Sequence, residues 1–355
     1  GAKALCSANL PDPTIKKPNK HFDTLLYTGN GSDDRDITGL DFSPDWLWIK
    51  ERNSTSAHCL VDSVRGSTKR LISSSTSAEA TETNTVQSFS SNGFQVGTDG
   101  AVNENNKTYV AWNWKGGGSA SSNSDGTITS SVSANTSAGF SIVTYTGDNA
   151  SATVGHGLGV APNVVMVKRR DGTGDWIIGH DGLASDAFAN NKFLKFSTNS
   201  TFTNSLVWGS QPTSTVVQIV TGSGATNLNG SSDTYVMYCF SEVAGFSKFG
   251  SYTGNQNTKG TFVFTGFRPA LVITKGDWGG NWNMYDNSRN SFNVANKTLY
   301  PNLSNAESTE NSSGNQMDLL SNGFKLRGSN NDTNHAADFI YLAFAESPFK
   351  YSRAR

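Results

Sequence analysis

The chain has 355 residues, of which 35% are apolar, 16% charged and 11% aromatic, and its formal net charge is −1. A nearly neutral chain with scattered Lys and Arg lacks the basic surface that nucleic-acid binding requires. No apolar run approaches the roughly 20 residues of a membrane-spanning helix, so membrane insertion is not expected. Abundant Ser, Thr, Asn and Gly between aromatic and β-branched runs predict an all-β protein.

The chain opens with a segment unlike the rest and then repeats itself. Residues 1–21 lack the apolar core and cleavage site of a signal peptide, so we expect an extended N-terminal segment. Three similar phrases follow, YTGN, YTGD and YTGN, each leading to a proline and an apolar run. The spacings are 118 and 107 residues for the tyrosines (Tyr27, Tyr145, Tyr252) and also for the prolines (Pro44, Pro162, Pro269). Two landmarks with the same spacing indicate an internal repeat.

The three segments also close alike, with YVAWNWK, YVMYCFSE and FIYLAFAE. Short apolar runs separated by Gly, Asn, Asp and Ser are typical of a β-sandwich. We therefore predict three tandem, jelly-roll-like β-sandwich domains at residues 22–115, 139–244 and 245–355. The Gly/Ser-rich segment 116–138 predicts a flexible linker and a hinged first domain. Three sheets around a pseudo-threefold axis are the alternative architecture.

The phrase SNGF occurs twice, from Ser91 and from Ser321. Asn-Gly is a strong hairpin signal because both residues tolerate positive φ, and the residues that follow alternate as a strand does. The middle segment lacks the phrase. We interpret it as a hairpin used twice rather than as a ligand-binding signature.

Two of the eight tryptophans stand apart from the others. Most align with apolar residues of the other segments, which predicts core positions. Trp208 and Trp278 have no apolar counterpart, and Trp278 lies in the loop GDWGGNW beside Asp277 and Asn281. These four residues are therefore the predicted ligand contacts, for a saccharide or a protein. The alternative is that each ring packs onto its own domain.

A pair of oppositely charged residues recurs in the first and third segments, in DSVR from Asp62 and DNSR from Asp286. The middle segment has His180 and Leu183 at these positions. A ligand site built on the pair would be missing there. We interpret the pair as a structural ion pair or a brace for a turn.

No motif predicts catalysis, a cofactor or a firm metal site. The five histidines are dispersed, and neither GxSxG nor HExxH occurs. The three cysteines are too far apart for a zinc site, and we expect Cys59 and Cys239 in the core. Asp33, Asp34 and Asp36 in NGSDDRD are weak candidates for calcium, although a solvated hairpin turn is the simpler interpretation. We expect a protein without enzymatic activity.

Several phrases resemble a known family. PDWLWIK, DSVRGSTKRLISSST, SFSSNGFQVGTDGAVN and YVAWNWKGGG are similar to a repeat domain of virion proteins from marine bacteriophages, often found downstream of lectin-like modules. The resemblance covers nearly the whole chain after about residue 22 and is strongest in the first segment. It implies a phage structural or adhesion protein in the virion, such as a tail fibre or spike. It implies no catalytic residue.

The expected function is therefore a non-enzymatic virion appendage that binds a glycan or protein of the host surface, in contact with other virion proteins. We expect a homotrimer, in which many weak contacts gain strength from avidity. Two alternatives remain. One is a capsid or tail decoration protein that binds only virion proteins, and the other is a polysaccharide depolymerase, which would need two facing carboxylates in a cleft.

Overall fold

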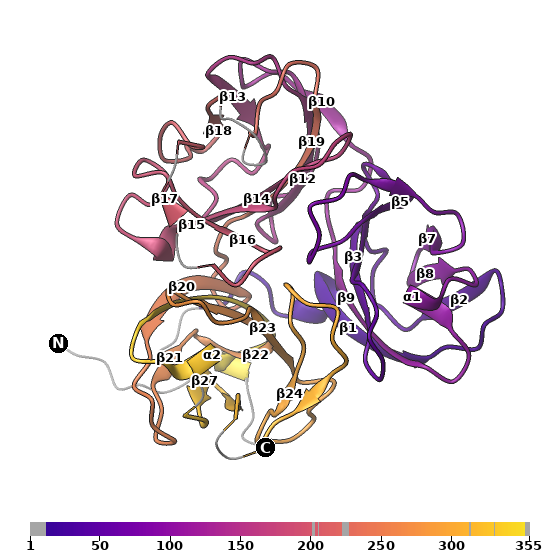
Figure 1. Cartoon of the computed structure of the whole chain (residues 1–355), viewed down its shortest axis with the longest axis vertical. Coiled ribbons are helices and arrows are strands. Elements are labelled where there is room, and N and C mark those ends of the chain that lie inside the picture. Colours follow the sequence, from indigo (N-terminus) through magenta and orange to yellow (C-terminus); the bar gives the residue numbers. More distant parts are fainter. Residues whose placement is uncertain are drawn as a thin grey trace.

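The computed structural model describes residues 12–200, 203–204, 206–221, 227–311, 314–329 and 331–351. The protein is all-β, as predicted, with 44% of residues in strands and 5% in helices. The strands form three lobes arranged around a common centre (Figure 1). Among the described residues, no helix has the length and apolar character needed to cross a membrane.

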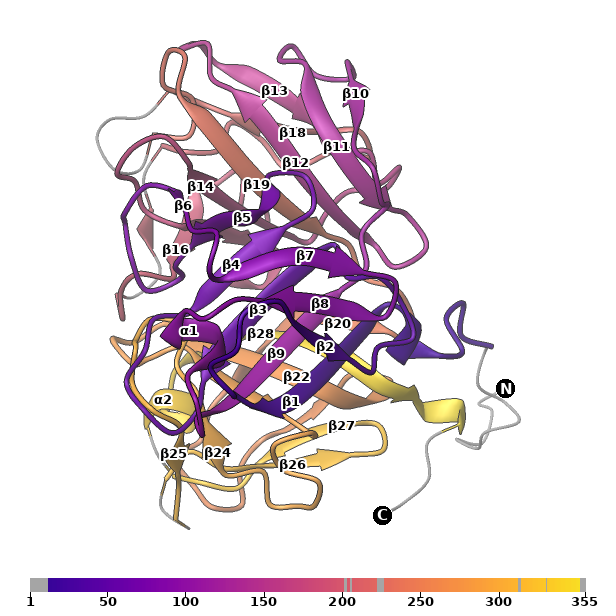
Figure 2. The same ribbon diagram turned by 90° about the vertical axis from the view of Figure 1, so that its right-hand side faces the viewer.

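Lobe 1 is a two-layer sandwich of antiparallel sheets (Figure 2). A six-stranded sheet, in the order β1-β9-β3-β4-β5-β6, faces a three-stranded sheet, β2-β8-β7. Buried apolar side chains from both sheets form one cluster between the layers. The elements are η2 (Pro18–Lys20), β1 (Phe22–Thr28), β2 (Arg35–Thr38), β3 (Trp46–Glu51), β4 (Cys59–Asp62), β5 (Gly66–Leu71), β6 (Ala80–Thr81), β7 (Val86–Ser90), β8 (Gly93–Val96), α1 (Gly100–Asn103) and β9 (Thr108–Trp114).

Lobe 2 has an eight-stranded sheet, β10-β11-β12-β19-β14-β15-β16-β17, and a two-stranded sheet, β13-β18. A second apolar cluster lies between them. The elements are β10 (Ser121–Asn123), β11 (Ser130–Asn135), β12 (Phe140–Thr146), β13 (Ala152–Gly155), β14 (Val164–Arg169), β15 (Ile177–His180), η3 (Asp181–Leu183), β16 (Lys192–Lys195), β17 (Thr203–Asn204), β18 (Val216–Ile219) and β19 (Thr234–Phe240).

Lobe 3 has a four-stranded sheet, β20-β28-β22-β23, a three-stranded sheet, β21-β27-β26, and the pair β24-β25. A third cluster fills the space between the two larger sheets. The elements are β20 (Ser247–Thr253), β21 (Phe262–Phe264), β22 (Phe267–Gly276), β23 (Asn283–Asp286), β24 (Lys297–Thr298), β25 (Ser308–Thr309), β26 (Met317–Leu320), β27 (Gly323–Leu326), α2 (Asn331–Asn334), β28 (Asp338–Pro348) and η5 (Phe349–Tyr351).

The large sheets share a four-strand order and bury both of their faces. β1-β9-β3-β4 in lobe 1 corresponds to β12-β19-β14-β15 and to β20-β28-β22-β23. Side chains alternate along each strand, so one set packs inside its own lobe and the other points to the centre of the molecule. This explains why β3, β14 and β22 each contain a run of at least four consecutive apolar, buried residues.

A fourth apolar cluster joins all three lobes at the centre. It contains Trp46 and Trp114 of lobe 1, Tyr238 and Phe240 of lobe 2, and Phe344 of lobe 3. The rings of Trp46 and Tyr238 stack with centroids 4.6 Å apart, and those of Phe240 and Phe344 lie 5.8 Å apart. The lobes therefore share one core, as in the arrangement around a pseudo-threefold axis that the sequence left as the alternative.

The flexible linker and the hinged first domain predicted from residues 116–138 are wrong. This segment contains β10 and β11, which pair with each other and extend the large sheet of lobe 2. Gly117 packs so closely that a side chain there would overlap the backbone of Ala134. A Gly/Ser-rich composition permits flexibility, but it also permits close backbone packing, and the second property is used here.

A ring nitrogen of each lobe also donates a hydrogen bond to a backbone carbonyl of a neighbouring lobe. Trp176 Nε1 of lobe 2 donates to the carbonyl of Ile72 in lobe 1 at 2.9 Å. Trp282 Nε1 of lobe 3 donates to Lys195 in lobe 2, also at 2.9 Å. The counterpart in lobe 1 is His58, whose Nε2 donates to Tyr300 and Leu303 of lobe 3 at 3.0 and 3.1 Å. These contacts run in the same direction around the centre and close the ring.

The recurring YTG phrase has a structural explanation. A side chain on its glycine would overlap a backbone carbonyl oxygen, that of Glu104 for Gly29 and those of Gly230 and His335 for the other two glycines. A buried asparagine holds the residue after the glycine in every lobe, through hydrogen bonds to its backbone nitrogen at 2.9 to 3.0 Å. These asparagines are Asn103, Asn229 and Asn334. The phrase fixes a turn and is not a binding motif.

The two SNGF phrases form hairpins, as predicted, in β7-β8 and β26-β27. Their glycines, Gly93 and Gly323, lie against the carbonyl oxygens of Ile37 and Val263 on the neighbouring strand, where a side chain would overlap. The phenylalanine that follows is fully buried in each case.

Candidate ligand-binding site

Three of the four predicted ligand contacts lie together in the loop between β22 and β23. Asp277 is exposed, and Trp278 and Asn281 are partly exposed. The corresponding loops of lobes 1 and 2, RNSTSAH and RDGTGDW, have no counterpart of Trp278, because Trp176 matches Trp282. The aromatic ring of Trp278 is thus not required by the architecture that the lobes share.

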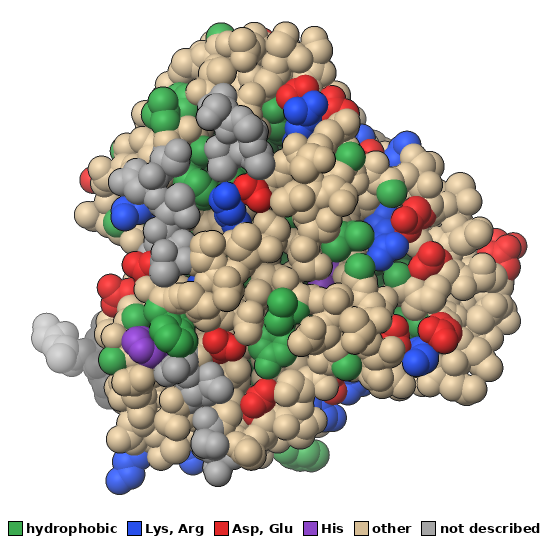
Figure 3. All heavy atoms as spheres, in the orientation of Figure 1, with side chains coloured by type: hydrophobic (Ala, Val, Ile, Leu, Met, Phe, Trp, Pro, Cys, Tyr) green, Lys and Arg blue, Asp and Glu red, His purple; other side chains and the backbone are tan. Residues whose placement is uncertain are grey.

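Trp278 is held in place by a second ring. It stacks on His335, which follows α2, with ring centroids 4.2 Å apart and an angle of 4° between the planes. Figure 3 shows a histidine beside hydrophobic side chains on the surface of this lobe. Trp278 Nε1 and His335 Nδ1 are buried without a hydrogen-bond partner within the described residues. Such nitrogens usually bond to water or to a ligand.

A network of amides fixes the loop that carries Trp278. Both oxygens of Asp332 in α2 accept hydrogen bonds from Asn281, from its backbone nitrogen at 3.2 Å and from Nδ2 at 3.1 Å. Asn302 Nδ2 donates to Asn281 Oδ1 at 2.8 Å. Asn283 Nδ2 donates to the carbonyls of Asn281 and Asp332 at 2.9 and 3.0 Å. The loop is therefore braced from both sides before any ligand arrives.

Trp208 lies elsewhere and does not belong to this site. Its side chain is 0% exposed and packs in the core of lobe 2 against Phe188, with ring centroids 5.2 Å apart. Its Nε1 donates to the carbonyl of Lys192 at 3.3 Å. The structure does not support a ligand contact here, because the ring has no accessible face. The burial of the Trp208 ring by tertiary packing could not be predicted from the polar residues beside it in the sequence.

The three aspartates named as weak calcium candidates are exposed on lobe 1. Asp33 accepts a hydrogen bond from Gln87, Asp36 accepts one from Gln95, and Asp34 adopts a positive φ of 52° in the turn. Within the described ranges, no group of three His, Cys, Asp or Glu side chains is placed to hold a metal ion. The solvated turn, which was the simpler interpretation, describes Asp33 and Asp34, whereas Asp36 lies in β2.

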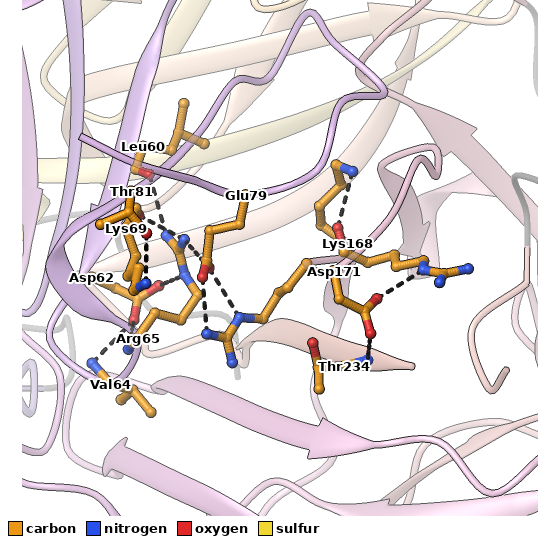
Figure 4. Close-up of polar contacts among 12 residues, drawn as sticks. Leu60, Asp62, Val64, Arg65, Lys69, Glu79, Thr81, Lys168, Asp171 and Thr234 are labelled. Atoms are coloured by element: carbon orange, nitrogen blue, oxygen red, sulfur yellow. Dashed lines mark hydrogen bonds and ion pairs between the residues drawn. The ribbon is translucent and has the colours of Figure 1, made fainter. Parts of the chain in front are cut away.

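The Asp–Arg pair of lobe 1 belongs to a relay across the interface with lobe 2 (Figure 4). Arg65 Nε donates to Asp62 at 2.5 Å, and Arg65 Nη1 donates to Glu79 at 2.8 Å. Arg170 of lobe 2 donates two hydrogen bonds to the same Glu79, at 2.9 and 3.0 Å. Tyr238 of lobe 2 donates to Asp62 at 2.7 Å. Burial raises the pKa of Glu79, but hydrogen bonds from Arg170 and Arg65 outweigh burial and leave the pKa below its usual value.

The same relay joins lobe 3 to lobe 1. Arg289 Nε donates to Asp286 at 2.6 Å, and Arg289 Nη1 donates to Glu307 at 3.2 Å. Arg52 of lobe 1 binds Glu307 through two bonds of 2.9 Å each. Trp112 Nε1 of lobe 1 takes the place of the tyrosine and donates to Asp286 at 3.1 Å. The predicted structural ion pair is therefore half of a contact between lobes.

At the matching positions between lobes 2 and 3, which lie in the described part of the chain, uncharged residues replace the Asp–Arg pair. His180 occupies the Asp position, and its Nε2 donates to the carbonyl of Tyr341 at 3.1 Å. Leu183 occupies the Arg position and is buried. Asp277 stands where the other two interfaces have Arg170 and Arg52. Burial lowers the pKa of His180 to about 4, so the imidazole is neutral at pH 7.

Sequence reasoning missed three buried lysines at matching positions. Lys50, Lys168 and Lys275 are 0% exposed, and each Nζ donates to the carbonyl of the following residue, at 2.6, 3.0 and 2.7 Å. Burial lowers the pKa of each to about 8. Their spacings of 118 and 107 residues match those of the prolines, so the signal was present in the sequence.

The comparisons with known proteins agree with a single three-lobed unit. A family model described as a domain of unknown function (DUF7483) matches residues 17–348, which span all three lobes. No curated protein matches the chain. Because the match begins before β1 and ends with β28, the family unit corresponds to the body with the shared core and not to one sandwich. The chain belongs to the DUF7483 family.

Proposed function

We propose that this chain is a non-enzymatic bacteriophage virion protein, a tail-fibre or spike-type appendage that binds the host surface. The observation that carries the proposal is the braced loop around Trp278, which lobe 3 alone carries. Exposed aromatic residues beside polar groups are typical of recognition surfaces. The resemblance of the sequence to phage virion proteins supports the setting.

The buried charges favour binding over catalysis. Arg65 and Arg289 pair with Asp62 and Asp286 of their own lobes, and both aspartates accept a hydrogen bond from an aromatic residue of the neighbouring lobe. Both oxygens of Asp332 accept hydrogen bonds from Asn281, so this carboxylate is engaged in bracing the loop. A rigid body with a braced loop suits recognition, because little freedom is lost when a ligand binds.

Ancestry and assembly remain part of the proposal. We infer that the lobes derive from one jelly-roll-like sandwich repeated in tandem, since their large sheets share strand order and their YTG turns share contacts. The partners would be other virion proteins and a host-surface glycan or protein. A homotrimer would form through outer faces, because the three lobes of one chain already meet in a common core.

One observation favours a second candidate, a capsid or tail decoration protein that binds only virion proteins. Phe262 and Phe264 are 44% and 54% exposed on β21, which lies at one edge of its sheet. Phe264, Pro348 and Phe349 also line a groove of about 590 Å³. Exposed aromatic residues beside a groove suit contact with another protein.

Gold-labelled antibody against the chain, applied to intact virions, separates these candidates. We expect label on a tail appendage and inhibition of phage adsorption by the purified chain. Label on the capsid without inhibition of adsorption favours the decoration protein. An absence of label on virions rejects both, and release of reducing ends from host polysaccharide by the purified chain would replace them with a depolymerase.

A further inference from the structure

We propose that β21 of lobe 3 (Phe262–Phe264) pairs edge to edge with the β21 of a second copy of the chain. The inference goes beyond the proposed function, because this contact does not depend on what the chain binds. It rests on three features of the strand: a free edge, two exposed phenylalanines and a register that suits pairing with itself.

The three lobes differ in the side chains that one equivalent edge strand turns outward. β2, β13 and β21 match, because each pairs with the next strand of its small sheet through one core residue, Ile37, Val154 or Val263. The flanking residues turn outward, and they are Asp36 and Thr38 in β2, Thr153 and Gly155 in β13, and Phe262 and Phe264 in β21. The two phenylalanines are therefore not required by the architecture that the lobes share.

Lobe 2 shows that the free side of this strand accepts a further strand. Ile128 forms a parallel bridge with Val154, and its backbone nitrogen donates to the carbonyl of Thr153 at 3.1 Å. In lobe 1, β2 carries Arg35 and Asp36, and charges on an edge strand oppose such pairing. Among the described residues, β21 has neither a covering strand nor a charge. It belongs to the outer layer of lobe 3, whose strands β26 and β27 lie on the side away from lobe 2 (Figure 2).

The backbone of β21 turns half of its hydrogen-bonding groups to the free side. The carbonyl of Thr261 accepts from the nitrogen of Leu326, and the nitrogen of Thr265 donates to the carbonyl of Asn322, each at 3.0 Å. Residues of an antiparallel strand bond to a given neighbour in alternation. The two phenylalanines, each one residue away from these positions, therefore direct their N–H and C=O groups away from β27.

A two-fold axis at Val263 makes the strand its own complement. Phe262 then lies opposite the partner's Phe264, and the two residues exchange both of their backbone hydrogen bonds, as does the pair related by symmetry. The four rings share the outer face, where aromatic pairs across strands stabilise a sheet. Lys325, opposite Phe262 on β27, lies at least about 14 Å from its own copy, beyond the ~8 Å over which charges act in physiological salt.

The size of the contact predicts a weak, reversible dimer. Phe262 and Phe264 are 44% and 54% exposed, so two copies cover on the order of 400 Å² of aromatic surface. Stable complexes bury about 1,200 to 2,000 Å² in total. We therefore expect a dissociation constant of about 10 to 100 μM, measured by sedimentation equilibrium of the purified chain up to about 0.5 mM.

Disulfide trapping tests the register. Phe262→Cys and Phe264→Cys are made separately in a Cys6→Ser background, since Cys59 and Cys239 are buried. In the mixed sample the two new thiols lie on residues about 5.5 Å apart between Cα atoms, within disulfide range. Each variant alone places its two copies about 8 Å apart, which is too far. Mild oxidation with glutathione disulfide should give a cross-linked dimer in the mixture and little in either variant alone.

A variant that copies the edge of lobe 1 tests the strand itself. Phe262→Asp/Phe264→Thr introduces the residues that β2 has at these positions, and it should raise the dissociation constant at least about tenfold. Phe292→Ala is the matched control, because Phe292 is 78% exposed in the same lobe and its neighbour Asn293 bonds to β26 at the far edge of the sheet. The control should associate as the parent chain does. Thermal unfolding confirms that each variant is folded.

Several outcomes overturn the inference: a parent chain that is monomeric at the highest concentration, an oligomer that a folded edge variant leaves intact, or equal cross-linking in the single and mixed samples. An assembly whose mass the edge variant halves supports the contact, whether that assembly is a dimer or a pair of homotrimers. A monomeric parent chain leaves the two phenylalanines to a different protein, as in the decoration candidate.

Discussion

Two interfaces between lobes use the same charged relay, and the third does without it. Arg65 and Arg289 each bind an aspartate of their own lobe and a glutamate that is gripped by an arginine of the next lobe. Between lobes 2 and 3, a neutral histidine, a leucine and a backbone carbonyl occupy the same geometry. The aspartate, its arginine and the arginine of the neighbouring lobe are all replaced there, by His180, Leu183 and Asp277, which indicates that they function as a unit.

The difference shows that the shape of the interface does not depend on the charges. A buried ion pair costs desolvation free energy that its attraction roughly repays, so an apolar replacement of the whole unit is often neutral or stabilising. Removal of one member is different, because an uncompensated buried charge remains. The comparison therefore predicts large effects for partial relays and small effects for complete replacements.

Arg65→Leu is expected to have the largest effect. It leaves Asp62 buried without its cation and removes one of the two arginines that bind Glu79. The free energy of unfolding should fall by about 3–5 kcal/mol, the usual cost of breaking a buried pair. Urea unfolding at pH 7 measures the change, and Arg289→Leu should give a similar value because its surroundings are the same in kind.

The double variant Asp62→His/Arg65→Leu is the sharper test, because it copies the neutral arrangement of lobe 2. We expect it to recover part of the stability that Arg65→Leu loses. A double variant as unstable as the sum of its two single variants would show that the relay members act independently, and the proposed unit would be wrong.

The sequence predicted the parts of this comparison that lie close together along the chain. Asp62 and Arg65 are three residues apart, as are Asp286 and Arg289, so their pairing and its loss in lobe 2 were visible. Glu79 and Glu307 follow their arginines at different distances, and the gripping arginines come from other lobes. No local pattern encodes such contacts, because they depend on how the lobes pack.

The same limit explains the remaining successes and errors. Alternating apolar residues and Asn-Gly turns revealed an all-β chain and both SNGF hairpins, since these patterns act locally. The composition of segment 116–138 could not show that β10 pairs with β11. Trp208 and Trp278 looked alike in sequence, yet only Trp278 reaches the surface, because burial of a loop is decided by tertiary packing.

Acid should weaken the interfaces that contain histidine. Burial lowers the pKa of His180 to about 4 and, together with the charge of Lys50, that of His58 to about 3. Both values lie below the unfolded value of 6.5, so the stabilisation is complete above pH 6.5 and is lost as pH falls towards the folded pKa. We expect His180 alone to account for on the order of 3 kcal/mol between pH 6.5 and pH 4. Urea unfolding at several pH values measures this slope.

His180→Gln provides the control for the acid effect. Glutamine can still donate to the carbonyl of Tyr341 but does not take up a proton in this range. The stability of this variant should fall less steeply between pH 6.5 and pH 4 than that of the parent chain. Equal slopes would show that the carboxylates alone govern the acid response, and that His180 does not distinguish the neutral interface.

The buried lysines give the smallest expected effect and extend the comparison to charges whose ammonium groups, among the described residues, donate to backbone carbonyls. At pH 7 we expect Lys275→Met to change the free energy of unfolding by less than about 1 kcal/mol, because relief of desolvation offsets the lost hydrogen bond to Gly276. Lys168→Met should cost about 1 kcal/mol more, since Lys168 Nζ also donates to the carbonyl of Thr76 across the interface between lobes 1 and 2, at 3.1 Å.

The pH dependence of stability distinguishes two effects of these Lys→Met substitutions, namely removal of a buried charge and loss of side-chain packing. The folded pKa of about 8 lies below the unfolded value of 10.5, so the folded chain releases its protons first as pH rises. Stability should therefore increase above pH 8, and Lys→Met variants should lack their share of the increase. If Lys168→Met instead costs as much as Arg65→Leu at pH 7, the ammonium group is a full member of the relay. The stability of the interface between lobes 1 and 2 would then depend on the charge of Lys168 as well as on Asp62, Arg65, Glu79 and Arg170.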